Sequence, residues 1–206
     1  MIARLNSSTI DWRLLRVRAG QNPLMVVGVI VCLAWIVISL LADQIAPYDP
    51  LAQDIMARLQ GPSDAHWFGT DQLGRDVLAR VLYGGRTSLP AGLLVVASAT
   101  AIGTVFGAIG GYIGGVWDEL LMRFTEVFMA FPIIILAMAI AAALGPSVNN
   151  AIIAMTVVWW PNYARIIRSL VISVKSNEYV ESARAIGASP LRILFRTILP
   201  NCVAPA

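Results

Sequence analysis

Residues 127–164 read VFMAFPIIILAMAIAAALGPSVNNAIIAMTVVWWPNYA and contain no charged side chain. As one helix these 38 residues would extend about 57 Å, nearly twice the bilayer's hydrocarbon thickness of about 30 Å. The pairs Gly145-Pro146 and Asn149-Asn150 supply turn chemistry near the middle of the run. The stretch therefore predicts two membrane-spanning helices, 127–144 and 147–164, joined by a turn at 145–146.

Two more uncharged runs precede this stretch. Residues 19–42 are 24 uncharged positions and predict a span at 24–42, and residues 87–117 are 31 positions and predict a span at 88–112. Arg4, Arg13, Arg16 and Arg18 before the first run also fit a signal peptide. That alternative is the weaker one, because the apolar run exceeds the usual length of about 7–15 residues and no clear small-residue cleavage site follows it.

The composition agrees with an all-α integral membrane protein. Of the 206 residues 58% are hydrophobic and 13% charged, with a mean hydropathy of +0.73. So few charges cannot cover a water-facing surface, which excludes a cytosolic enzyme, a disordered chain and a disulfide-rich secreted module. The net charge of +3 is weak evidence for nucleic-acid binding, since no dense basic run is present. The two cysteines have no metal-ligand spacing.

The distribution of Lys and Arg predicts the orientation. With the N-terminus inside, the cytoplasmic segments 1–23, 113–126 and 165–200 carry eleven basic residues, whereas the extracytoplasmic segment 43–87 carries four. The positive-inside rule favours this arrangement, which places the turn at 145–146 outside.

None of the four predicted spans contains Asp, Glu, Lys, Arg or His. Proton relays and ion-coupled carriers generally need such groups, so any transport should draw its energy from another subunit. Small residues recur every fourth position through the second span, a ridge that lets another helix approach closely. We expect helix packing at Ala99, Gly103, Gly107, Gly111 and Gly115.

Prolines and aromatic residues in the last two spans have ordinary structural explanations. Pro132 and Pro161 predict kinks in their helices. Trp159, Trp160 and Tyr163 lie close to Arg165 at the inner end of the fourth span and fit an interfacial aromatic belt.

The extracytoplasmic segment 43–87 predicts a turn followed by an amphipathic helix on the membrane surface. Thr70 or Asp71 can cap this helix, and its polar side would carry Arg75, Asp76 and Arg80. An intramembrane hydrolase is the enzymatic alternative, since His66, Asp71 and Ser88 are hydrolase residue types. This alternative is weak, because no G-x-S-x-G motif is present and no serine stands beside the single histidine at a recognisable spacing.

The cytoplasmic segment 165–200 predicts two short helices separated by a glycine turn. Asn177 can cap the first helix, Gly187 fits its left-handed end, and Ser189-Pro190 begins the second. A plain basic loop held at lipid headgroups is the alternative. The capped helix-turn-helix pattern instead favours a knob that docks in another protein.

At these residues the chain resembles the permease subunits of bacterial ATP-binding-cassette importers, in particular the second permease of the dipeptide, oligopeptide and nickel group. The family's Glu-Ala-Ala loop has its counterparts at Glu181, Ala183, Gly187, Leu199 and Pro200, with Ser182 replacing the first Ala and Thr197 an Ile. The outer series Phe-Gly-Thr-Asp, Gly-Arg-Asp and Gly-x-Arg-x-Ser-Leu is matched by the stretch 68–89, including Gly69, Thr70, Asp71, Gly74, Arg75, Asp76 and Arg86. Asn22-Pro23 also matches.

The resemblance implies a polytopic helical bundle of the type I importer permease kind, located in the bacterial inner membrane. Six spans are expected, of which four are present, with residues 201–206 beginning a truncated fifth. The expected partners are a homologous permease in a heterodimer, two cytoplasmic ATPases that bind ATP and Mg, and an extracytoplasmic solute-binding protein. The loop around Glu181–Gly187 would couple ATPase closure to alternating access, and the chain itself would hold no catalytic residue, metal or cofactor.

The resemblance leaves the cargo open among dipeptides, longer peptides, nickel and other small solutes, with peptide the first choice. An ion-independent channel or a secondary transporter subunit is the alternative class.

Overall fold

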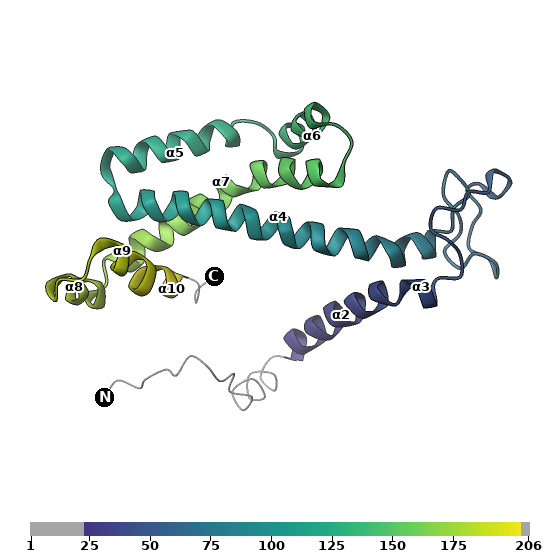
Figure 1. The fold of residues 1–206 in the computed structure, drawn as a ribbon, viewed down its shortest axis with the longest axis horizontal. Coiled ribbons are helices and arrows are strands. Elements are labelled where there is room, and N and C mark those ends of the chain that lie inside the picture. The colour runs from purple at the N-terminus through teal and green to yellow at the C-terminus, as the bar shows by residue number, and fades with distance from the viewer. Residues whose placement is uncertain (1–22, 203–206) are drawn as a thin grey trace. The chain divides into compact units, whose positions relative to one another are not determined.

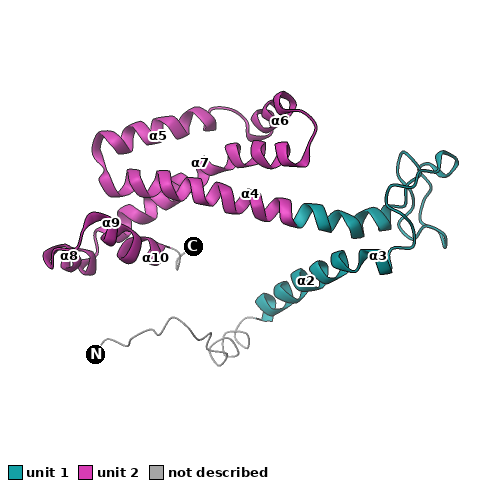
Figure 2. Ribbon diagram, in the orientation of Figure 1, with its two compact units in different colours: residues 1–89 teal, residues 90–206 magenta. Residues whose placement is uncertain are grey.

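The computed structural model describes residues 23–202, and in this range the chain is helical with one isolated β-bridge. The predicted N-terminal segment, with Arg4, Arg13, Arg16, Arg18 and Asn22, and the last four residues of the predicted fifth helix lie outside the described residues. Two compact units divide the chain at residues 89 and 90 (Figure 2). Helix α4, Val77–Ile113, begins in the first unit and ends in the second, with Pro90 in its interior.

In the first unit, the helix α2, Pro23–Leu40, begins at a proline, which suits the first helical position because that position needs no N–H. Its 18 residues carry no charge, and most of its large side chains are exposed, as a lipid-facing helix requires. The short helix α3, Ala42–Ile45, and the 3-10 turn η1, Ile55–Ala57, follow. The separate amphipathic helix predicted in segment 43–87 is wrong, because its helical residues are the first turns of α4.

In the second unit, α4 lies beside α7, Val148–Lys175, and α5, Gly115–Met129, lies along α7 as well (Figure 1). α6, Ile133–Leu144, packs against α7 and ends at Gly145, which has φ +91°. The predicted cytoplasmic loop 113–126 is therefore mostly helical.

The predicted third span is broken in the structure. α5 ends at Met129, α6 begins at Ile133, and the two helices are inclined by 82°. Pro132 causes the break, because it lacks an N–H and disfavours a helical conformation in Phe131 before it. The kink predicted at Pro132 is thus a change of direction between two helices.

Among the described helices, α2 and α4 are each long and apolar enough to span a membrane, and α5 with α6 forms a third candidate as a bent pair. α7 does not have the required apolar stretch, since asparagines, Pro161 and arginines dilute it. It continues as one helix through Pro161 to Lys175, eleven residues beyond the predicted end. The span at 147–164 stays a prediction.

Two buried clusters lie in the second unit. In the first, Trp160 is 5% exposed and its ring centre lies 4.8 Å from that of Phe106 and 5.4 Å from that of Phe128. The prediction that Trp160 belongs to an interfacial aromatic belt is therefore wrong, because its partners are on neighbouring helices. The second cluster joins the end of α7 to the C-terminal helices through Val171, Val174, Val180, Ile193, Leu194, Ile198 and Cys202.

Candidate functional site

The outer motif predicted from the sequence forms a tight hydrogen-bonded structure in the first unit. Thr70 is central to it: its hydroxyl donates to the carbonyl oxygen of Ala57 and accepts from the backbone N–H of Gln60 at 3.0 Å. The backbone N–H of Thr70 also donates to the carbonyl of Gln60 at 3.0 Å, and that of Leu59 to the carbonyl of Asp71 at 3.1 Å. These bonds fasten residues 57–60 onto residues 69–71.

Asp71 organises the turn that follows. Its Oδ1 accepts from the backbone N–H of Leu73 at 2.8 Å and of Arg75 at 3.1 Å, and its Oδ2 pairs with the guanidinium groups of Arg75 and Arg80. Burial acts to raise the pKa of the Asp71 carboxyl, but the hydrogen bonds from the Arg75 side chain and from the two backbone N–H groups hold this pKa well below its ordinary value. The prediction that Thr70 or Asp71 caps the helix is wrong, because the side chains of both residues bond elsewhere in the motif.

The cap of α4 is Asp76, whose Oδ2 accepts from the backbone N–H of Ala79 at 2.7 Å. The Asp76 side chain is 1% exposed, so its predicted place on the polar side of a surface helix is wrong. Its Oδ1 lies 3.0 Å from Nδ1 of His66. Because His66 pairs with Asp76 and not with Asp71 or Ser88, the three residues named for a hydrolase do not form a triad.

Gly69 and Gly74 occupy left-handed backbone positions, with φ of +71° and +72°. A Cβ at Gly69 would collide with the carbonyl oxygen of Gln60, and one at Gly74 with the backbone of Asp54. Both glycines are therefore required by conformation and by close backbone approach.

We expect Gly74→Ala to open the outer motif. The substituted residue would be strained in its left-handed conformation and would push residue 54 away, at a total cost of about 2 kcal/mol, or roughly thirtyfold in the open fraction. The measurement is the rate of tryptic cleavage at Arg58, which is exposed beside this contact. Gly61→Ala is the matched control, since a Cβ there meets no atom within 4 Å, and an equal rate increase in both variants would contradict the assignment.

Arg86 ties α4 to the end of α2. Its guanidinium donates to Asp43 at 3.0 and 2.8 Å, to the carbonyl of Ser39 at 2.8 Å and to that of Leu40 at 2.6 Å. These carbonyls belong to the last turn of α2, where arginine compensates for missing helical donors. Hydrogen bonds from Arg86 and then Tyr83 lower the pKa of Asp43. The partners of Arg86 are not predicted from the sequence, because they lie more than forty positions earlier in the chain.

The small-residue ridge of α4 lies against α7. An added Cβ would meet Tyr163, Ala164 and Trp160 at Gly103, the backbone of residues 164 and 168 at Gly107, and Arg168 and Val171 at Gly111. Gly115 differs: it begins α5 after Gly114, both glycines have positive φ, and nothing lies within 4 Å of a Cβ there. Including Gly115 in the packing ridge was therefore wrong, since the chain turns before reaching it.

Two basic side chains of α7 fasten it to the neighbouring helices α5 and α4. Arg168 of α7 donates to both carboxylate oxygens of Asp118 of α5, at 2.5 and 2.6 Å. Nζ of Lys175 donates to the carbonyl of Tyr112 at the end of α4 at 2.6 Å. Neither pair was predicted, because each joins residues that are fifty or more positions apart.

The segment 165–200, predicted to be cytoplasmic, forms the helix-turn-helix that the sequence predicts, starting with α8, Glu178–Ala185. Gly187 has φ +80°, its N–H donates to the carbonyl of Arg184 at 2.9 Å, and the N–H of Ala188 donates to that of Ala183 at 3.1 Å. This is the Schellman pattern of helix termination. The predicted left-handed end at Gly187 is confirmed. Asn177 stands at the N-cap position but its side chain makes no capping hydrogen bond.

The second arm runs from Pro190 to Cys202 as α9, Pro190–Ile193, a π-helical turn η2, Leu194–Ile198, and α10, Leu199–Cys202. The Ser189 side chain caps α9, as predicted. Pro200 accounts for the π turn, since a proline cannot bond to the carbonyl four residues earlier and its ring crowds that group. Leu199 packs against the buried cluster, whereas Pro200 is exposed.

The knob, residues 178–198, has a buried base and an exposed tip. Val180 is fully buried against α7, and Ala183 packs on the same cluster. Glu181 and Ser182 face outward, and the exposed fractions of Ile186, Leu191 and Phe195 are 85%, 69% and 62%. A firmly held element with apolar residues at its tip has the character of a docking surface.

Comparison with known protein families finds two matches to this chain. Residues 103–206 match the family described as binding-protein-dependent transport system inner membrane component, and residues 12–62 match the N-terminal TM domain of oligopeptide transport permease C.

Three relatives show the extent of the similarity. The dipeptide transport system permease protein DppC of Alkalihalophilus pseudofirmus is 42% identical over 94% of this chain and 64% of its own length. The probable D,D-dipeptide transport system permease protein DdpC of Escherichia coli is 39% identical over 98% of this chain and 66% of its own length. The glutathione transport system permease protein GsiD of Shigella sonnei is 44% identical over 94% and 63%. The chain thus spans less than two thirds of the length of these relatives. It belongs to the family of binding-protein-dependent transport system inner membrane components.

Proposed function

We propose that the chain is a membrane permease subunit of an ATP-driven importer that receives short peptides from a solute-binding protein. The relatives named for dipeptide, D,D-dipeptide and glutathione transport support a peptide cargo. Nickel and other small solutes remain the alternative for the same class of importer. The family's description as an inner membrane component supports location in the bacterial inner membrane, with the N-terminus in the cytoplasm as the basic residues predict.

The proposed assembly contains a homologous permease, two cytoplasmic ATPases and an extracytoplasmic binding protein. ATP and Mg belong to the ATPases in this scheme, so the chain carries out no chemistry of its own. Its task is to change between inward-facing and outward-facing arrangements when the ATPases close. Such a change needs a contact whose interaction energy differs between the two states.

In our proposal the knob 178–198 makes this contact with the ATPases. The single observation that carries the proposal is that the base of the knob is buried and its apolar tip is exposed. Val180, Ile193 and Ile198 are at most 2% exposed and pack with Val171 and Val174 of α7. Because packed interiors transmit displacement, motion of the knob would move α7 with it. α7 is in turn fastened to α5 through Arg168 and to α4 through Lys175.

The tip would enter a cleft of the ATPase. Beside Gly187 lies a cavity of about 270 Å³ lined by Ile186, Arg192 and Arg196 among others. Apolar and guanidinium groups together suit a protein interface, where aromatic, Met and Arg residues are enriched and buried apolar area supplies affinity.

Photocrosslinking in the intact transporter tests this docking. A benzoylphenylalanine introduced at position 186 should form an adduct with an ATPase subunit. One introduced at position 93 should not, because Leu93 is similarly exposed, at 71%, but lies within the predicted span 88–112. Adducts with the ATPase from position 93, or none from positions 186, 191 and 195 in a transporter with normal uptake, would refute the docking.

A further inference from the structure

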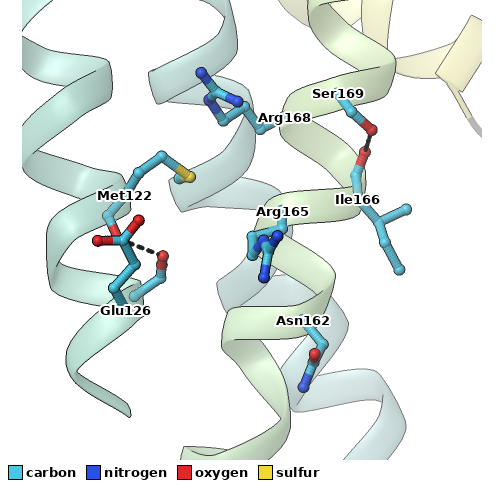
Figure 3. A pocket seen from close by; sticks show the side chains of 8 residues that line it. Met122, Glu126, Asn162, Arg165, Ile166, Arg168 and Ser169 are labelled. Atoms are coloured by element: carbon cyan, nitrogen blue, oxygen red, sulfur yellow. Dashed lines mark hydrogen bonds between the residues drawn. The ribbon is translucent and has the colours of Figure 1, made fainter. Parts of the chain in front are cut away.

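An open cavity of about 660 Å³ lies between α5 and α7, away from the knob (Figure 3). Its polar lining comes from Thr125 and Glu126 on α5 and from Asn162, Arg165, Arg168 and Ser169 on α7, while Met122 and Ile166 supply the apolar wall. A volume of this size is typical of small-molecule sites. The coupling role proposed above uses Arg168 to hold α7 on α5 but assigns no ligand to this cavity.

The two arginines that line the cavity differ in their engagement. Arg168 is held by both carboxylate oxygens of Asp118, so its charge is already balanced. Arg165 is exposed, and within residues 23–202 no carboxylate lies within 4.0 Å of it; its contact is Sδ of Met129, 3.6 Å from Nη1. Arg165 therefore offers a planar set of donors that suits phosphate or carboxylate.

Glu126 brings the opposite charge to the same cavity from the facing helix (Figure 3). Its Oε2 accepts from Arg123 at 3.3 Å, and this pair is exposed on both sides, with 71% and 59% of the side chains accessible. Exposed pairs of this kind are weak, so the carboxylate stays available to a second donor. The hydroxyl of Ser169 donates to the carbonyl of Ile166 and can still accept a hydrogen bond.

A ligand for this cavity should thus carry an anionic group and an ammonium group a short distance apart. The predicted topology places Arg165 one residue after the span 147–164, at the cytoplasmic surface of the membrane. The zwitterion present at that depth is a phospholipid headgroup.

We propose that the cavity between α5 and α7 binds the headgroup of phosphatidylethanolamine. The phosphate accepts from Arg165 and the Asn162 amide, the ammonium donates to Glu126 and the Ser169 hydroxyl, and the glycerol end lies against Met122 and Ile166. The negative charge of Glu126 repels a purely anionic lipid. A choline headgroup has no N–H group that could donate a hydrogen bond to Glu126.

Native mass spectrometry of the intact purified transporter measures the phospholipid retained after detergent exchange in equimolar phosphatidylethanolamine, phosphatidylcholine and phosphatidylglycerol. The wild type should retain phosphatidylethanolamine preferentially. Arg165→Gln should lower its retention about tenfold, as expected for loss of a charged hydrogen bond. Glu126→Gln should leave phosphatidylcholine binding unchanged and abolish the preference for phosphatidylethanolamine over it.

Arg58→Gln is the control, since Arg58 is an exposed arginine that lies outside the knob and lines none of the cavities described above. If Arg165→Gln fails to assemble, Arg165→Lys keeps the charge and should lose part of the retention. Equal retention in the wild type and Arg165→Gln, or equal loss in Arg58→Gln, would overturn the site.

Competition separates the possible sources of the zwitterion. Glycerophosphoethanolamine should displace the retained lipid, whereas the dipeptide Ala-Ala should not at the same concentration. Displacement by the dipeptide alone would reassign the cavity to peptide cargo. Because lipid retention is measured without nucleotide, its failure and the failure of ATP coupling are separate results.

Discussion

Gly187→Asp should abolish ATP-driven uptake while the protein remains in the membrane. The backbone at Gly187 has φ +80°, which aspartate tolerates better than most residues, and a Cβ there meets no atom of the chain within 4 Å. The knob should therefore still fold. The loss of uptake arises at the docking surface. There the new carboxylate beside Ile186 is either buried without a partner, or it pairs with Arg192 and Arg196 and so prevents them from contacting the ATPase. Burying an unpaired charge costs several kcal/mol, so uptake should fall about a hundredfold.

Gly187→Asn is the control for this prediction, because it has nearly the same shape and tolerates the same backbone without adding charge. Labelled-peptide uptake by vesicles containing the intact transporter is the measurement, with the amount of membrane-inserted chain determined by immunoblot. Normal uptake by Gly187→Asp would remove the knob from the mechanism. A loss of the chain itself would show that Gly187 is needed for folding instead.

Gly107→Ala should strongly destabilise the second unit. A Cβ at this position would press on backbone atoms of Ala164 and Arg168, so α4 and α7 would have to separate. Overpacking against a rigid backbone costs about 3 kcal/mol. The hydrogen bond from Lys175 to the carbonyl of Tyr112 joins the same two helices and would weaken as well. The melting temperature of the purified transporter should fall clearly.

The same helix provides the matched control, Gly92→Ala, because a Cβ at Gly92 meets nothing within 4 Å. Alanine is the better helix former by about 1 kcal/mol, so this variant should melt at the wild-type temperature or slightly above it. An unchanged melting temperature for Gly107→Ala, or an equal decrease for both variants, would contradict the close approach of α4 and α7.

The parts of this fold that could be predicted depend on local signals. The uncharged run of α2, the end of α6 at Gly145, the Ser189 cap and the left-handed turn at Gly187 each follow from a few adjacent residues. The predicted role of the α4 ridge also corresponds to contacts at Gly103, Gly107 and Gly111, because a four-residue period of small side chains has one main use in membrane helices.

The predicted and observed helices differ where an apolar composition does not show in which direction a helix runs or how long it is. Residues 127–144 are uniformly apolar, so hydropathy cannot show that Pro132 turns the chain by 82° between two helices. Helix α7 continues past Arg165 and Arg168 to Lys175, and the partner of Arg168, Asp118, lies on another helix and is not evident from the local sequence. Likewise, the burial of Asp76 was not predicted, because aspartate is usually exposed. The residue that pairs with its buried carboxylate, His66, is ten residues away in the sequence.

The candidate sites also divide into features that adjacent residues indicate and features that depend on contacts between distant residues. The outer motif was found as a set, but its organisation around Thr70 and Asp71, and the role of Arg86 at the end of α2, depend on contacts that no local pattern records. The cavity at Arg165 had no sequence signal apart from an arginine directly after an apolar run. Pairing Arg165 with Glu126 requires that α5 lie along α7, which only the three-dimensional structure provides.

Reconstitution tests the central claim most directly. The intact transporter that contains this chain would be placed in liposomes with the binding protein and a labelled dipeptide on the outside and ATP enclosed. Our account predicts dipeptide accumulation that requires enclosed ATP, the binding protein and the chain, and that stops in the Gly187→Asp variant. Accumulation that proceeds without ATP under an ion gradient, or that is unchanged when the chain is omitted, would contradict it.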